Sequence, residues 1–374
     1  MGKSSEIRLT RPNISQPEIE AVTQVLLSGM LVSGPVVERF EKMLADYLGL
    51  PYAVCVSSGT AALHLSLLSA DIKPGDEVLV PALSFPATAN TVEIIGAVPI
   101  FIDCQPDGVN LDAEKLENKI SPRSKAIMPV HAFGIPAEMD RILSVAKKYN
   151  LVVIEDAACA LGSKYNNVYC GTIGELAAFS FHPRKLLTTG EGGAVISSDQ
   201  STINLVKSLR NHGYDGDDFR YPGFNYRMTD FQAGMGLMQL EKFSSMLEER
   251  KKMAADYKSM LQDIEWLKVI EAGPEAQPNI QTFIVKLDKY VDRKSLMKYL
   301  GMHGIETTIG SYCLPLMRYY RLRYGYRPEE FPHAFDNYNR LLSLPLYKGM
   351  STQEMEKVVR ALKSFTVKIE KVNG

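Results

Sequence analysis

The chain has 374 residues, of which 45% are hydrophobic and 23% are charged, and its formal net charge is −1 at pH 7. This length exceeds what one core usually organises, so two or three units are expected at about 150 residues per domain. The near-neutral charge excludes the basic surface that nucleic-acid binding requires, and no run of about 18 apolar residues predicts a membrane span.

The opening residues, MGKSSEIRLTRPNIS, lack the apolar stretch of a secretory signal. The five cysteines are scattered and include no C-x-x-C pair, and the six histidines lack the spacing of metal ligands. We therefore expect a cytoplasmic protein with reduced cysteines and with no metal site.

From residue 52 onward, short apolar runs alternate with helical patterns. Strands are predicted at YAVCVSS, EVLVPA, VPIFID, KAIMPVHAFG, LVVIEDA, AAFSF and GAVISS, and helices at GTAALHLSLLSA and PAEMDRILSVAKKYN. Nearly continuous apolar strands between amphipathic helices are typical of a sheet that helices cover on both faces. The sequence therefore predicts an α/β fold.

The pattern changes from residue 235. The stretch MGLMQLEKFSSMLEERKKMAADYKSMLQDI predicts one long amphipathic helix, and a strand and two helices are predicted at FIVKLDKY, DRKSLMKYLGMHG and STQEMEKVVRALKSF. We interpret residues 1–245 as a large domain, including an N-terminal arm and helix, and residues 246–374 as a smaller C-terminal α+β domain.

Several common catalytic motifs are absent from the sequence. It contains no G-x-x-x-x-G-K-[ST], no G-x-G-x-x-G after a strand, no H-E-x-x-H and no G-x-S-x-G. Phosphoryl transfer by a P-loop, hydride transfer on a dinucleotide and zinc-dependent hydrolysis are therefore disfavoured.

Polar and aromatic side chains instead follow several of the predicted strands. After YAVCVSS the sequence continues through Ser58, Gly59 and Thr60 into a helix, whose first amides and the Thr60 hydroxyl would seat an anion. The alternative is that Ser58 or Thr60 only caps the helix. Asp156 ends the run LVVIED, where ligands of open α/β sheets bind, although a carboxylate there can also belong to a turn. Phe85 follows another strand, and by default it would be core.

Lys185 lies between a strand and a glycine-dense turn in AFSFHPRKLLTTGEGGAVIS, and by default it would face water. Pyridoxal phosphate needs a lysine for a Schiff base, a carboxylate for its ring nitrogen, a phosphate seat and a stacked aromatic ring. These needs are matched in turn by Lys185, Asp156, residues 58–60 with Ser180, and Phe85. The joint pattern favours this cofactor more strongly than any single residue does.

The sequence resembles the DegT/StrS-type sugar aminotransferases, a branch of the fold-type I, aspartate-aminotransferase-like pyridoxal phosphate enzymes. The resemblance covers nearly the whole chain and includes RPNISQPEIEAV, LLSGMLVSGPVVERFE, SSGTAALHLSL, FPATANTVEIIGAVPIFIDC, PVHAFGIPAEMD, IEDAACALGS, SFHPRKLLTTGEGGAVI, GFNYRMTDFQAGMGLMQLEK, GIETT and LSLPLYKGMSTQEMEKVV. It implies a large domain with a mixed, mostly parallel sheet flanked by helices, and a homodimer with shared active sites.

The resemblance also implies individual roles. Lys185 matches the Schiff-base lysine, Asp156 the partner of the pyridine nitrogen and Phe85 the stacking ring. Phosphate contacts are implied for Gly59, Thr60, the amide of Ala61, Ser180, and an Asn225 supplied by the neighbouring subunit. Residues implied to meet the sugar nucleotide or to shape the site are Met30, Ser33, Gly34, His131, His182, Arg227 and Tyr312.

Two positions depart from the family pattern. Cys159 stands beside the cofactor where relatives often carry glutamine or histidine, so a stronger polar contact is lost there. Met30 occupies a position that is often aromatic. The two remaining histidines that we considered, His64 and His212, are interpreted as structural.

The implied reaction moves an amino group from an amino acid, with L-glutamate as the expected donor, to a keto group of a nucleotide-linked sugar. The cofactor would alternate with its pyridoxamine form in a ping-pong cycle. Relatives that remove a sugar hydroxyl carry histidine at the position of Lys185, so amination is preferred. The alternatives are a dehydration or other pyridoxal phosphate reaction, a non-catalytic regulator, and an unrelated α/β protein.

Overall fold

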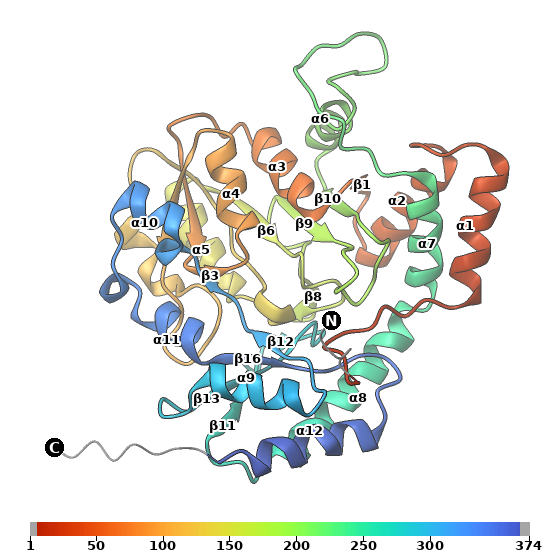
Figure 1. Cartoon of the computed structure of the whole chain (residues 1–374). Coiled ribbons are helices and arrows are strands. Elements are labelled where there is room, and N and C mark those ends of the chain that lie inside the picture. The colour runs from red at the N-terminus through yellow and green to blue at the C-terminus, as the bar shows by residue number, and fades with distance from the viewer. Residues whose placement is uncertain (1–5, 367–374) are drawn as a thin grey trace.

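A seven-stranded sheet forms the centre of the large domain in the computed structural model, which describes residues 6–366 (Figure 1). The strand order is β1-β10-β9-β6-β5-β2-β4, and β10 alone in this sheet runs antiparallel to its neighbours. The strands are β1 (Tyr52–Val56), β2 (Glu77–Pro81), β4 (Val98–Ile102), β5 (Ser124–Ile127), β6 (Val152–Asp156), β9 (Leu176–Ser180) and β10 (Gly193–Ser197).

Helices cover both faces of this sheet, as the continuous apolar strands predict. One face shares a core with α3 (Gly59–Ser69), α4 (Ala87–Ile94) and α6 (Gln200–Leu209). The other face packs against α2 (Pro35–Leu48), α5 (Met139–Tyr149) and α7 (Asp230–Glu241). The predicted α/β class is confirmed.

The small domain is built on a four-stranded antiparallel sheet, ordered β11-β13-β16-β14. Its strands are β11 (Leu267–Val269), β13 (Phe283–Leu287), β16 (Leu341–Leu344) and β14 (Thr308–Ile309), and its helices are α8 (Phe243–Leu261), α9 (Arg293–Met302) and α12 (Thr352–Ser364). Ile7 joins the same core from the N-terminal segment, where its amide donates to the Gly304 carbonyl at 2.9 Å.

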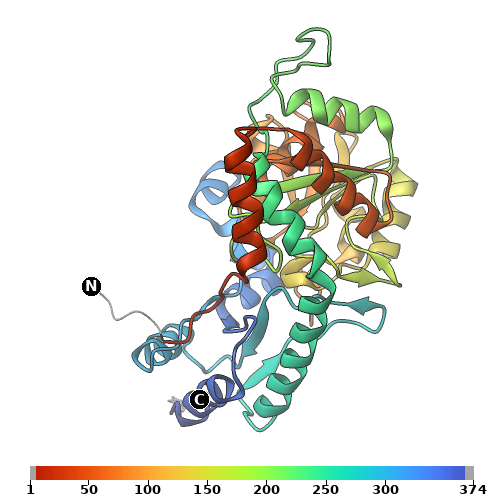
Figure 2. The ribbon, with the colours of Figure 1, turned by 90° about the vertical axis from the view of Figure 1, so that its right-hand side faces the viewer.

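The stretch predicted as one long helix forms two helices, α7 and α8, that meet at Lys242. α7 lies along α1 (Gln16–Ser28), whereas α8 leaves toward the small domain (Figure 2). The Lys242 ammonium pairs with Glu18 and donates to the Ser15 hydroxyl at 3.0 Å, and Phe243 is fully buried. These tertiary contacts end α7 although the local sequence pattern continues.

The predicted boundary between residues 245 and 246 lies inside α8, and short strands link the two parts of the chain. β12 (Ala276–Gln277) pairs with β7 (Lys164–Tyr165), which also pairs with β8 (Val168–Tyr169), and β15 (Tyr312–Cys313) pairs with β3 (Leu83–Ser84). The neighbouring helices, α10 (Arg318–Tyr324) and α11 (Pro332–Arg340), contribute to the core of the large domain. The division at residue 246 stays a prediction.

Residues 212–224 form a long loop that projects from the large domain beside α6 (Figures 1 and 2). Within it, Tyr214 and Phe219 pack with their ring centroids 5.3 Å apart, yet Phe219 remains 66% exposed. Between residues 6 and 366, no helix is both long and apolar enough to cross a membrane.

Candidate active site

Most of the predicted cofactor residues lie at one edge of the central sheet. Because β1, β9, β6 and β2 run in the same direction, their carboxyl ends meet there, where open α/β sheets bind ligands. Ser180 and Asp156 end β9 and β6, Gly59 begins the helix after β1, and Phe85 follows β3, the short strand next to β2.

Asp156 is buried and held by two hydrogen bonds. One carboxylate oxygen accepts from the Thr88 hydroxyl at 2.7 Å, and the other accepts from the Ala158 amide at 3.2 Å. Burial raises the pKa of the Asp156 carboxyl above its ordinary value, and these bonds and the charge of Lys185 offset the increase only in part. A cationic partner for this carboxylate would therefore be strongly favoured.

The adjacent Glu155 fixes the end of β6. Its fully buried carboxylate accepts from the amides of Gly171, Ile173 and Gly174, each at 2.7 Å, and lies 2.8 Å from Nε2 of His131. The Nδ1 atom of His131 accepts from the Ala137 amide at 3.0 Å, so Nε2 carries the proton and donates to Glu155.

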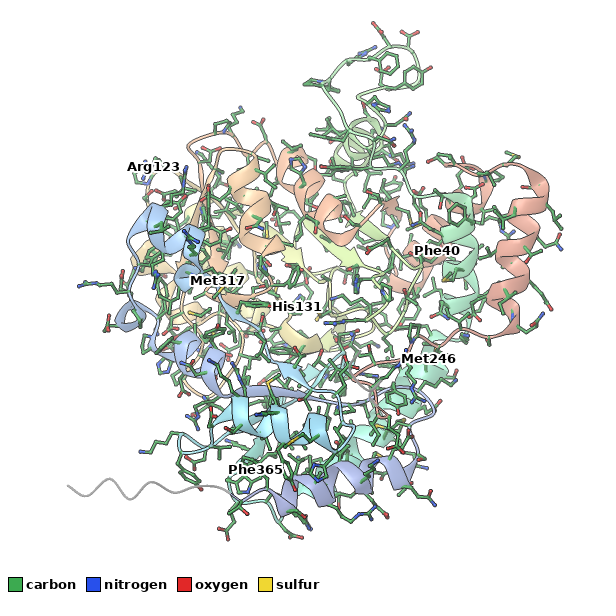
Figure 3. The ribbon with its side chains drawn as sticks, viewed as in Figure 1. Phe40, Arg123, His131, Met246, Met317 and Phe365 are labelled. Carbon is green, nitrogen blue, oxygen red and sulfur yellow. The ribbon has the colours of Figure 1, made fainter. Side chains whose placement is uncertain are left out.

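His131 therefore lies in the interior of the large domain, where its ring is fully buried (Figure 3). Both of its ring nitrogens are occupied by protein partners, which fits a residue that shapes the site rather than one that touches a sugar. His64 also packs internally, with its Nδ1 atom 3.2 Å from the Tyr226 hydroxyl and its ring against Phe224, as its structural interpretation predicts. The other histidine given that interpretation, His212, is exposed.

Lys185 lies in the loop between β9 and β10 and is half-buried. Its Nζ atom donates to Sγ of Cys159 at 2.9 Å, and Cys159 follows Asp156 by three residues. A thiol accepts hydrogen bonds only weakly, so this contact holds the ammonium loosely. The structure thus brings Lys185, in the loop after β9, to Cys159, in the loop after β6, close enough to Asp156 at the end of β6 for the Lys185 charge to act on it. The neighbouring His182 accepts the Arg184 amide at its Nδ1 atom, 3.2 Å away.

The predicted phosphate seat lies where α3 begins. Ser58 caps the helix and accepts the Ala61 amide at 3.1 Å, so that amide is already occupied and the capping interpretation holds for Ser58. The earlier amides of Gly59 and Thr60 lie in the first turn, which has no intrahelical acceptor for them. A Cβ on Gly59 would lie 2.7 Å from Cβ of Ser180. Glycine therefore lets the helix N-terminus approach the Ser180 hydroxyl closely.

Phe85 is 66% exposed, so the default interpretation as a core residue does not hold. Its ring meets Tyr312 nearly edge-on, with centroids 6.5 Å apart, and Tyr312 pairs with the backbone of Ser84. An exposed aromatic ring, a buried carboxylate, a lysine and a helix N-terminus kept open by glycine form a set that fits pyridoxal phosphate.

Three of the predicted sugar-binding residues, Met30, Ser33 and Gly34, lie in one connected segment. Val32 pairs with Thr229, the Ser33 hydroxyl donates to the Met228 carbonyl at 3.3 Å, and the Gly34 amide donates to Asp230 at 2.7 Å. A Cβ on Gly34 would lie 2.4 Å from an Asp230 oxygen, so Gly34 is also needed for packing. Met30 is 55% exposed at the start of this segment.

Arg227 and Asn225 follow the projecting loop. The Arg227 guanidinium donates to the Asn211 side chain at 2.6 Å, and its backbone pairs with Val56, the last residue of β1. Arg227 therefore lies beside the phosphate seat. Asn225 is exposed and pairs through its backbone with Asn211. The functions of all these residues stay predictions.

Replacing Gly59 by alanine is expected to weaken cofactor binding by at least about tenfold, because the added Cβ would push apart α3 and Ser180. The cofactor affinity is measured by titrating the absorbance of the bound cofactor. Gly301→Ala in α9 is the matched control, since a Cβ there meets nothing within 4 Å. An unchanged affinity in Gly59→Ala would show that the seat lies elsewhere.

The model of the DegT/DnrJ/EryC1/StrS aminotransferase family matches residues 12–363. The chain belongs to this family. It is 42% identical over 265 residues to the GDP-perosamine synthase of Caulobacter vibrioides, a match that covers 70% of this chain and 71% of that protein.

Similar solved structures agree with the fold. Spr1654 of Streptococcus pneumoniae, solved in its PLP and PMP forms, superposes in the PMP form with a TM-score of 0.91 at 29% identity, covering 96% of each chain. DesI with its TDP-sugar product gives a TM-score of 0.89 at 29% identity, covering 97% of this chain and 93% of DesI.

These findings confirm three predictions for this family member. The fold is that of the fold-type I aminotransferases, the protein is an aminotransferase, and its cofactor is pyridoxal phosphate, which passes through the pyridoxamine form.

Thr88, which holds Asp156, was not singled out from the sequence. It lies in the first turn of α4 and carries no local signal of this contact.

Proposed function

We propose that the enzyme transfers the amino group of L-glutamate to the keto group of a nucleotide-linked sugar, at a site completed by a second copy of the chain. The observation that carries the proposal is the grouping of Lys185, Asp156 and the Gly59–Ser180 seat at one sheet edge of a family member. The sugar substrate is supported by two relatives, the GDP-perosamine synthase and DesI with its TDP-sugar product.

Each residue of the site has a distinct task in this proposal. Bound pyridoxal phosphate supplies an electron sink for the negative charge that develops at the substrate carbon. Lys185 would hold the cofactor through Nζ, and its free amine would take up and return the proton of the substrate carbon. Asp156 would supply the negative charge that favours a protonated ring nitrogen. The positive charge of that nitrogen would in turn favour the charged form of the Asp156 carboxyl.

The loose contact between Lys185 and Cys159 suits this movement. Nζ must leave its resting position in every cycle, and a weak thiol acceptor costs little to abandon. Gly59, Thr60 and Ser180 would hold the phosphate group, and Phe85 would shield the ring from water.

A homodimer with shared sites is supported by exposed apolar side chains. Around α1 and the segment after it, six apolar residues are between 41% and 76% exposed, namely Ile19, Leu26, Leu27, Met30, Leu31 and Val32. A patch of this kind usually marks an interaction surface. Asn225 directly follows the projecting loop and is exposed, so it is available to complete the phosphate seat of the other subunit.

A panel of GDP- and TDP-linked keto sugars with L-glutamate tests the proposal. We expect parallel lines in double-reciprocal plots, which indicate ping-pong kinetics, and an amino sugar nucleotide identified by mass spectrometry and NMR. A deoxygenated sugar product would indicate dehydration instead. Absence of turnover and of both half-reactions across the panel would favour a regulatory protein and contradict the proposal.

A further inference from the structure

One buried side chain brackets Lys185 from a distant part of the sequence. The side-chain nitrogen Nε2 of Gln281 donates to the Arg184 carbonyl at 2.6 Å, and the side-chain oxygen Oε1 accepts from the Leu186 amide at 2.9 Å. Gln281 therefore binds the peptide groups immediately before and after Lys185, and it is only 6% exposed. It lies just before β13 of the small domain.

Gln281 is itself held on both sides. The backbone amide of Gln281 donates to the Asn279 side chain at 2.8 Å. The backbone carbonyl of Gln281 accepts from the Arg250 guanidinium of α8 at 2.9 Å. Asn279 also donates to the carbonyls of Cys159 at 2.9 Å and Leu161 at 2.8 Å, on the loop that follows Asp156. One short segment thus contacts both loops that carry the predicted catalytic site.

The backbone of this segment is strained. Ile280, between the two amide side chains, has φ of 55°, which is rare for a β-branched residue. Such a conformation persists only where surrounding contacts hold it, and it is enriched at functional sites. The Ile280 carbonyl accepts from the Arg250 side chain, which makes a third bond to the Leu346 carbonyl at 3.1 Å. Arg250 therefore ties the segment to α8 and to the small domain.

We propose that Gln281 is a positioning residue that fixes the backbone at Lys185 so that only its side chain moves during the reaction. The inference rests on the proposed function, because it takes Lys185 as the residue that binds the cofactor. The physical basis is that Nζ must leave and return to the same atoms in each cycle, and small misplacements of reacting groups cost about 10²-fold in rate. Two hydrogen bonds from one rigid amide restrain both neighbouring peptide planes at once.

Replacing Gln281 by leucine tests the inference, because leucine fills a similar volume without either hydrogen bond. In the cofactor-free protein, we expect hydrogen exchange at the Leu186 amide to accelerate by at least about tenfold, as measured by mass spectrometry of overlapping peptides. In the holoenzyme, we expect kcat to fall by about 10- to 100-fold while KM for the sugar nucleotide changes by less than about threefold.

The matched control is Gln277→Leu, four residues earlier. Gln277 is exposed and donates to Asn167 at 2.8 Å, away from Lys185. A second variant, Gln281→Glu, keeps the acceptor for the Leu186 amide but not the donor to the Arg184 carbonyl. Its second carboxylate oxygen would face the Arg184 carbonyl oxygen, so we expect the Leu186 amide to keep its protection while kcat stays lowered. The glutamate variant also keeps the inference testable if the leucine variant does not fold.

The inference would be overturned if the folded leucine variant kept both the wild-type kcat and the wild-type exchange rate. If the leucine variant does not fold, a wild-type kcat in the glutamate variant would overturn it. Failure of the proposed function looks different. In that case the wild-type protein itself does not aminate any keto sugar of the panel, whatever the exchange at Leu186 in the variants.

Discussion

Lys185→Ala is expected to lower kcat by at least about 10⁴-fold, because it removes both the covalent attachment of the cofactor and the proton carrier. The absorbance of the lysine-linked cofactor should disappear together with turnover. Spectra and steady-state rates of the purified variant check both effects. A small primary amine such as methylamine, which can replace the missing Nζ in solution, should restore part of the rate.

The matched control is Lys289→Ala, which removes an exposed lysine of the small domain. It should retain the absorbance and the rate of the wild-type enzyme. A Lys185→Ala protein that keeps both would contradict the assignment of this lysine.

Asp156→Asn is expected to lower kcat by about 10²- to 10³-fold, because the neutral amide no longer stabilises a positive charge at the ring nitrogen. Asparagine has the same shape and can still pair with the Thr88 hydroxyl and the Ala158 amide. The loss should therefore appear in the rate and in the spectrum of the cofactor rather than in the fold.

Although Asp156→Asn should lower the rate, it is expected to stabilise the fold when the cofactor is absent. The pKa of Asp156 is raised in the folded protein, so between the unfolded and folded pKa values the folded state binds more protons. The free energy of unfolding contributed by this group therefore falls as the pH rises through that window. Cofactor-free Asp156→Asn should then be more stable than the cofactor-free wild type at neutral pH.

Thermal unfolding at several pH values measures this difference. The advantage of Asp156→Asn should shrink as the pH falls and vanish below the ordinary Asp pKa of about 3.9, where the wild-type carboxyl becomes protonated in the unfolded state as well as in the folded state. Asp256→Asn, which replaces an exposed carboxylate on α8, should show no such trend. A variant that is less stable than the wild type at every pH would show that Asp156 is not strained by burial.

The fold could be predicted from the sequence because its strands are short, apolar and separated by amphipathic helices. Residues at the ends of those strands, such as Asp156 and Ser180, could be predicted to meet because parallel strands place their carboxyl ends at one edge. The break at Lys242 could not, since it depends on contacts with α1 that no local pattern encodes.

The contacts that hold the site were equally hidden in the sequence. Thr88 reaches Asp156 from 68 positions away, and Gln281 reaches Leu186 from 95 positions away. Neither residue type is unusual at its place, and each acts only because the fold brings it there. By contrast, the hydrogen bond from the Ala61 amide to the Ser58 side chain could be expected from the sequence, because serine is a preferred residue just before a helix.

Borohydride reduction of the holoenzyme, followed by peptide mapping, tests the central assignment most directly. The reduced cofactor should remain bound to a single peptide spanning residues 182–187, with the label on the side chain of Lys185. Label on another lysine, or an unmodified Lys185 after complete bleaching of the cofactor absorbance, would contradict the account.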